Sequence, residues 1–236
     1  MVLSIQKQLR LLENKDKSQI LTGFFKTGKG QYGEGDKFLG LTVPVVRRVI
    51  KNYQAMTHQE IDQLIRSKYH EERLAAVLIL VSKYQKGDLN EKNDVYDFYL
   101  SHTKFINNWD LVDLSAHYIV GAHLFSNKDR QKILKNLAKS MFLWERRIAM
   151  ISTYYYIRKG EYKLVFDIAE ILLFDKHDLI HKAVGWMLRE VGKHGGEEVL
   201  ENFLNRHLSH MPRTSLRYAI ERFSESKRKR YLEKHR

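Results

Sequence analysis

The chain has 236 residues, with 41 Lys and Arg against 28 Asp and Glu, and carries a formal net charge of +13 at pH 7. It has no cysteine, which excludes disulfides and thiolate metal sites, and only two prolines, which favours long helices. The positive charge favours an acidic partner, above all nucleic acid, because Lys and Arg neutralise phosphates and release their counterions.

The sequence also indicates where the protein is found. Its first residues, Met-Val-Leu-Ser-Ile-Gln-Lys-Gln, contain no apolar run of the kind that a signal peptide has. No stretch approaches the ~20 apolar residues of a membrane-spanning helix. The absence of cysteine fits a reducing compartment. We therefore expect a cytoplasmic protein without a membrane partner.

Helical patterns dominate the chain from its N-terminal part onward. Thr42 precedes a Val-Pro pair and is typical of an N-cap, because proline is tolerated in the first turn of a helix. Thr57 and Glu60 form the pattern of a capping box. The segment 70–86 has apolar residues at helical spacing. Asn127, before Lys-Asp-Arg-Gln, predicts a further N-cap.

The predicted helices come in pairs that recur with a period in the mid-thirties, which is typical of α-solenoids of the HEAT or TPR kind. No segment alternates with period two for long enough to require a sheet. The sequence therefore predicts one all-α domain over 1–236, a HEAT-like helix-pair solenoid with a concave basic groove. The pairs are expected to open near Thr57, Glu91, Asn127, Glu161 and Gly196, and to break internally near Tyr69, Phe105, Phe142, Asp175 and His210.

The second helix of each predicted pair begins with large aromatic, acidic or basic residues at matching positions. Trp109 and Arg147 are 38 residues apart, and Arg147 and Trp186 are 39 apart. Because equivalent positions of a solenoid line one surface, we expect these side chains to form a stripe along a single groove. The members of this stripe are Trp109, Asp113, Arg146, Arg147, Lys182, Trp186, Arg189, Arg213 and Arg217.

Trp109 and Asp113 are the first candidates for chemistry, because residues four apart share one face of a helix. The alternative is structural. Asn108 can cap the helix, and acidic residues in a first turn gain from the helix dipole, an argument that suits Asp110 better than Asp113. A tryptophan at this place can equally belong to the core.

Trp186 and Arg147 have structural alternatives as well. Gly185 leaves room for a close approach by another backbone or a ligand, so Trp186 can be a core residue beside a packing glycine. Arg147 can be a solvated surface arginine. The functional interpretation of both residues depends on their places in the stripe.

Two further patterns are less specific. Gly28, Gly30 and Gly33 form a G-x-G-x-x-G pattern, but a helix-like segment precedes it and no βαβ unit follows, so a dinucleotide site is disfavoured. Its backbone amides are instead candidates for holding a DNA phosphate. His177 and His181 are four apart, but no Glu or Cys nearby completes a metal site. We expect neither a metal nor another cofactor.

Four motifs, in this order and spacing, resemble those of the AlkD-like DNA alkylation repair glycosylases, which are all-helical HEAT-like proteins. The resemblance extends over nearly the whole chain, from 24–28 to 219–223. The motifs are G-E-G-D-K-F-L-G-L-T-V-P at 33–44, N-W-D-L-V-D at 108–113, W-E-R-R-I-A at 144–149 and K-A-V-G-W-M-L-R-E at 182–190.

The resemblance implies roles for individual residues. The catalytic carboxylate of the family falls on Asp113, and the tryptophans that cradle DNA fall on Trp109 and Trp186. The arginine that holds the DNA backbone near the lesion falls on Arg147, with Arg146 as the weaker claimant. The remaining basic residues of the stripe are then expected to bind DNA.

The resemblance further implies a monomeric, monofunctional DNA glycosylase that excises N3- or N7-alkylated purines, such as 3-methyladenine and 7-methylguanine, from duplex DNA. The base is expected to stay largely in the stack. Asp113 would stabilise the oxocarbenium-like sugar and orient water. Asn108 stands where one branch of the family has a second tryptophan, and Phe24 replaces a tyrosine. Both differences concern the range of substrates.

Two other functions fit the same composition. One is a non-catalytic HEAT-like protein that recognises bent or branched DNA, which would not need the Asp113 carboxylate. The other is a scaffold for an acidic protein segment, which would bind DNA weakly at physiological salt. RNA binding is a weaker variant, because no signature of an RNA-binding module is present.

Overall fold

The computed structural model describes residues 1–235, and its contacts divide the chain into two compact units, Met1–Ser115 and Ala116–Arg236. Between residues 1 and 235 the structure is helical, and the one strand-like feature is an isolated bridge between Lys37 and Tyr69. None of the helices in this range has both the length and the apolar content that crossing a membrane requires. The predicted all-α class is confirmed, whereas the single domain and the basic groove stay predictions.

The first unit is built around the helix α5 (His70–Lys86), which contacts α1, α3, α4, α6 and α7. Every residue of α5 from His70 to Val81 is buried, so this helix is enclosed on all sides rather than along one stripe. Its first turn brings charged residues into the core. The other helices of this unit are α1 (Val2–Leu11), α2 (Lys15–Phe24), α3 (Val43–Ile50), α4 (His58–Ile65), α6 (Leu89–Ser101) and α7 (Trp109–Asp113).

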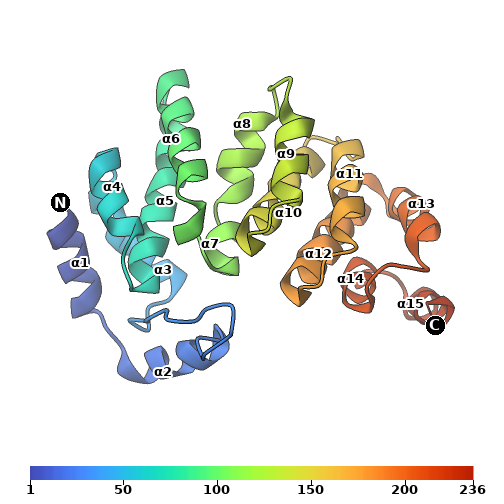
Figure 1. Cartoon of the computed structure of the whole chain (residues 1–236), viewed down its shortest axis with the longest axis horizontal. Coiled ribbons are helices and arrows are strands. Elements are labelled where there is room, and N and C mark those ends of the chain that lie inside the picture. Colours follow the sequence, from blue (N-terminus) through green and yellow to red (C-terminus); the bar gives the residue numbers. More distant parts are fainter. Residues whose placement is uncertain (236) are drawn as a thin grey trace. The chain divides into compact units, whose positions relative to one another are not determined.

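The second unit stacks helix pairs in two layers. The second helices of the pairs form one layer, in which α12 packs against both α10 and α14, and α11 packs against α9 in the other layer (Figure 1). This is the repeat packing expected of a HEAT-like array. After a π-helical turn at His117–Gly121, the helices are α8 (Ala122–Leu124), α9 (Arg130–Ala138), α10 (Leu143–Ile157), α11 (Lys163–Leu172), α12 (Asp178–Gly195), α13 (Glu197–His207), α14 (Arg213–Ala219) and α15 (Glu225–Lys234).

Glycines allow the second helices to pack closely. A Cβ added at Gly185 of α12 would lie 2.5 Å from the carbonyl oxygen of Ser215 in α14. At Gly121 it would lie 2.3 Å from the carbonyl oxygen of Ser152 in α10. The close approach predicted at Gly185 is therefore an approach by another backbone, and the glycine beside Trp186 serves helix packing.

The predicted helix starts are confirmed at some positions and wrong at others. Thr57 forms the complete capping box with Glu60, and Thr42 is the N-cap residue of α3, although its side chain makes no capping bond. Asn127 is not an N-cap. Its Oδ1 accepts from the backbone N–H of Asp129 at 2.7 Å, which forms an Asx turn, and α9 begins after Asp129.

Candidate functional site

The predicted pair of site residues lies on α7, a helix of five residues. Its N-cap residue is Asn108, whose Oδ1 accepts from the backbone N–H of Trp109 at 2.8 Å. Trp109 and Asp113 are half-buried, whereas Asp110 and the two residues after it are buried. The helix thus keeps its middle residues inside the unit and leaves the side chains at its two ends partly accessible.

Aromatic rings from α2 and the following loop hold the Trp109 indole. Phe25 stacks on it with ring centroids 5.2 Å apart, and Phe24 meets it edge-on at 5.9 Å. Phe25 stacks in turn on Phe38, at 5.0 Å. Phe24 is 59% exposed and Phe25 is buried, so Phe24 and Trp109 form the accessible end of this aromatic row. Contacts of this kind are worth about 0.5–1.5 kcal/mol each beyond the area they bury.

A buried network of charged side chains lies beneath this aromatic row. His70 Nε2 is 2.8 Å from Asp110 Oδ2, and His70 Nδ1 is 3.5 Å from Asp36 Oδ2. Arg73 Nη2 lies 2.7 Å from the other oxygen of Asp36. Burial by itself would lower the pKa of His70, but the carboxylates of Asp110 and Asp36 outweigh it and raise the pKa to about 9. The ring is therefore an imidazolium at neutral pH.

The Asp36 carboxyl responds in the opposite direction. Burial would raise its pKa, but the neighbouring His70 and Arg73 cations outweigh this effect and lower the pKa below the ordinary value. Sequence reasoning missed this network. The one available signal was H-E-E-R at 70–73, a charged run that opens an otherwise apolar helix.

The loop between α2 and α3 is fastened to the same end of α5. The Glu71 carboxylate accepts backbone N–H bonds from Leu39, Gly40 and Leu41 at 2.8, 2.9 and 3.0 Å. Gly40 has φ +79°, and a Cβ there would lie 2.1 Å from the carbonyl oxygen of Asn14, so only glycine fits. The loop therefore has a fixed path next to Trp109.

The glycine-rich part of this loop uses its amides internally. The N–H of Gly28 donates to the Gln31 side chain, that of Gly30 to Glu34, and that of Gly33 to the Lys26 carbonyl. A phosphate would have to displace these acceptors. The structure therefore gives no support to the expectation that these amides hold DNA.

In the second unit, the two arginines of α10 are bonded to the protein. Arg147 is only 4% exposed and donates from Nη1 to the Leu179 carbonyl at 2.5 Å. Arg146 pairs with Asp175 at 2.5 Å and donates to the Ser140 carbonyl at 3.0 Å. Arg146 thus ties two inter-helix turns together, which is a structural task.

The predicted residues of α12 are partly paired as well. Trp186 is half-buried. Lys182 Nζ lies 2.8 Å from Asp178 one turn earlier, and Arg189 pairs with Glu221. The Lys182 pair is exposed and contributes little to stability, so a DNA phosphate can compete for this cation. Arg189 is less exposed and also pairs with the buried Glu190 at 3.3 Å.

Arg213 and Arg217 on α14 are the more accessible predicted cations. Both are exposed, and Arg213 donates to the Leu232 carbonyl in a long bond of 3.4 Å.

His177 and His181 form hydrogen bonds in the turn before α12. His177 Nδ1 accepts from the N–H of Leu179, and His181 Nε2 lies 2.5 Å from the Asp175 carbonyl. Within residues 1–235 no group of three potential ligands is arranged to hold a metal ion.

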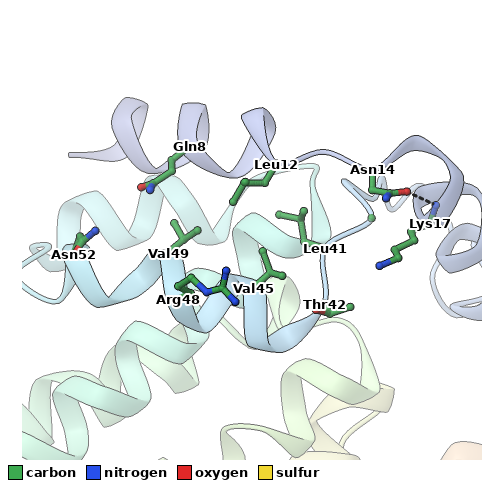
Figure 2. Close-up of a pocket in the computed structure, with 11 residues that line it drawn as sticks. Gln8, Leu12, Asn14, Lys17, Leu41, Thr42, Val45, Arg48, Val49 and Asn52 are labelled. Carbon is green, nitrogen blue, oxygen red and sulfur yellow. Dashed lines mark hydrogen bonds between the residues drawn. The ribbon is translucent and has the colours of Figure 1, made fainter.

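Two hollows flank α2 in the first unit. The smaller, of about 220 Å³, is mostly apolar, and its lining includes Phe24, Phe25 and Phe38 together with His70 and Asp110. The larger, of about 510 Å³, lies by α1 and α3, and Figure 2 shows Lys17 and Arg48 reaching toward it from α2 and α3. None of the described residues that line the larger hollow carries a carboxylate. Its lining therefore carries two cations, Lys17 and Arg48, and no anion.

A family model described as DNA alkylation repair enzyme matches residues 5–223. The chain belongs to this family. All predicted site residues, from Trp109 to Arg217, lie within the matched range.

A solved structure shows the same fold. A predicted DNA alkylation repair enzyme from Enterococcus faecalis superimposes with a TM-score of 0.71 and 17% sequence identity, covering 90% of this chain and 97% of that one. At this identity the likeness concerns the fold of the chain and not its substrate. No curated protein matches the chain.

Proposed function

We propose that this protein is a monofunctional DNA glycosylase that hydrolyses the N-glycosidic bond of N3- or N7-alkylated purines in duplex DNA. The observation that carries the proposal is the arrangement on α7. In a chain of this family, an indole and a carboxylate stand at its two ends, Trp109 and Asp113, and both are partly accessible. The N-W-D-L-V-D motif around them is the one whose resemblance assigns the catalytic carboxylate.

The chemistry of the lesion suits such a sparse site. Alkylation at N3 or N7 gives the purine a positive charge, so the base can leave with the bonding electrons without first being protonated. The positive charge then develops on the sugar. A carboxylate aimed at that charge lowers the barrier electrostatically, which is the role we propose for Asp113. The same group orients the water whose oxygen bonds to C1′, and the proton of that water passes to the carboxylate or to solvent.

The other predicted residues bind the DNA around the lesion. The indole faces of Trp109 and Trp186 contact deoxyribose and stabilise positive charge through their π systems. Arg213 and Arg217 are exposed and can reach phosphates as they stand, with Lys182 and Arg189 joining once their surface ion pairs open. Arg147, at 4% exposure, needs a local rearrangement to reach a phosphate.

The larger hollow of the first unit offers two more cations for the backbone. Lys17 and Arg48 reach toward it without an acidic neighbour among its described lining residues. We propose that a phosphate of the bound duplex lies there. The net charge of +13 supplies the long-range attraction that brings the two molecules together.

The direct test is the release of free 7-methylguanine from methylated duplex DNA, measured by mass spectrometry against a protein-free blank for spontaneous depurination. A uracil-containing duplex is assayed in parallel. We expect release of 7-methylguanine well above the blank and no release of uracil, which lacks the charge that weakens the bond. Tight DNA binding without any base release would favour the non-catalytic DNA binder. Rapid uracil release would contradict the charge-based mechanism.

A further inference from the structure

The short helix α7 cannot set its own direction. A single helical turn is unstable in isolation, so the orientation of α7 depends on contacts made by its ends and its buried face. A buried polar contact is made in its first turn, where Asp110 is 9% exposed and its Oδ2 lies 2.8 Å from His70 Nε2. The contacts that hold the His70 side chain in place therefore also help to orient α7, the helix that carries Trp109 and Asp113.

His70 has a second link to the same helix, through aromatic rings. Its imidazole stacks on Phe38 with centroids 4.7 Å apart and lies 5.0 Å from Phe25. Phe25 is the ring that stacks on Trp109. The side chain of His70 thus touches both Asp110 and the ring next to Trp109.

The surroundings of His70 favour a charged ring. Both ring nitrogens face carboxylates, Nε2 toward Asp110 on α7 and Nδ1 toward Asp36 in the loop. A neutral imidazole has only one N–H to donate, whereas an imidazolium has two. Arg73 on α5 faces the far side of Asp36, and the neighbouring Glu71 carboxylate is bonded to loop amides. Two cations and two carboxylates balance within the network.

We propose that His70, as a doubly paired imidazolium, is a positioning residue of the glycosylase site, which holds α7 so that Trp109 and Asp113 are presented to DNA. Its catalytic consequence rests on the proposed function, whereas its effect on the geometry of α7 does not. His70 is 2% exposed and acts through Asp110 and Phe25 rather than by contact with substrate. A displacement of reacting groups by about 1 Å costs roughly 10²-fold in rate, so a small shift of α7 has a large effect.

The test combines a structural and a kinetic readout on the full-length protein. The chain has three tryptophans, so 5-fluorotryptophan labelling gives three fluorine resonances, which Trp→Phe variants assign. In His70→Gln we expect the Trp109 resonance to move and those of Trp144 and Trp186 to stay. The single-turnover rate of 7-methylguanine release should fall about 100-fold, with the Kd for DNA nearly unchanged.

The matched control is His207→Gln, which removes another histidine–carboxylate pair, with Glu170 at 3.2 Å in the second unit. It should leave the rate and the Trp109 resonance at native values. The double variant His70→Gln/Asp110→Asn places two neutral amides against each other. It should recover much of the native rate and of the native Trp109 resonance. Recovery distinguishes positioning from a loss of overall stability.

Raising the pH tests the proposal on the native protein, without a substitution, because the pKa of His70 is about 9. The native Trp109 resonance should shift as pH rises through that value. The rate is not followed there because 7-methylguanine opens its ring in alkali.

If His70→Gln does not fold, Asp110→Asn removes the same contact between His70 and α7 and is used instead. A native Trp109 resonance and a native rate in these variants would overturn the proposal. If the native protein releases no base, only the proposed function is contradicted, because the fluorine spectra still show whether His70 positions α7.

Discussion

At the scale of single residues, the sequence reveals what a side chain shares with its own helix and little about its partners elsewhere. The spacing of Trp109 and Asp113 predicts one helix face, and the structure places both on α7. The partner of Asp110 is His70, forty positions away, and no local pattern connects the two. For the same reason, Arg147 could not be recognised as buried from its sequence context.

The stability of the protein should fall at alkaline pH because of His70. Its pKa in the folded state is raised from 6.5 to about 9, so the folded protein holds this proton more tightly than the unfolded chain. The contribution is fully present below pH 6.5 and is lost as pH rises through about 9, amounting to about 3 kcal/mol. Urea unfolding between pH 6 and 10 measures it. A slope that persists unchanged in His70→Gln would assign the loss to other groups.

At the scale of elements, the predicted helix pairs agree with the structure because apolar periodicity and capping are local. Tyr69, Phe142 and Gly196, predicted as breaks or openings, are the N-cap residues of α5, α10 and α13. The path of the loop between α2 and α3 was not predictable. It depends on Glu71 and on the close contact at Gly40, both of which involve residues far apart in sequence.

Gly185→Ala should destabilise the second unit. The added Cβ would lie 2.5 Å from the Ser215 carbonyl oxygen and 2.5 Å from Tyr218 Cβ, so α12 and α14 must move apart. We expect a loss of about 1–3 kcal/mol in the free energy of unfolding. Gly23→Ala in α2, where nothing lies within 4 Å, is the control and should instead gain about 0.5–1 kcal/mol. Equal effects of the two substitutions in urea unfolding would contradict the packing role of Gly185.

At the scale of the whole molecule, charge is the property that the sequence predicts most directly. The chain has 41 basic and 28 acidic residues whatever its fold. Which of the basic side chains are accessible depends instead on the ion pairs that form in the folded protein. Arg146 is engaged with Asp175, and Arg213 and Arg217 are exposed. The family match over residues 5–223 supports DNA as the partner of this charge.

DNA binding should weaken steeply with salt. Contact with roughly 5–8 phosphates gives a slope of log affinity against log salt of about −4 to −7. Lys17→Ala and Arg48→Ala should each reduce the magnitude of this slope by about 1, because each removes one proposed phosphate contact. Lys229→Ala is the control, since Lys229 on α15 is paired with Glu225 at 3.0 Å. A flat response of the native protein to salt would contradict phosphate binding by these basic residues.

We propose that the Asp113 carboxylate drives base release. The most direct measurement is the single-turnover release of 7-methylguanine by Asp113→Asn, beside Asp97→Asn, which alters an exposed carboxylate of α6 in the same unit. We expect a fall of about 10²–10³-fold in the rate of Asp113→Asn with DNA affinity retained, and a native rate for Asp97→Asn. A native rate in Asp113→Asn would contradict this role of the Asp113 carboxylate.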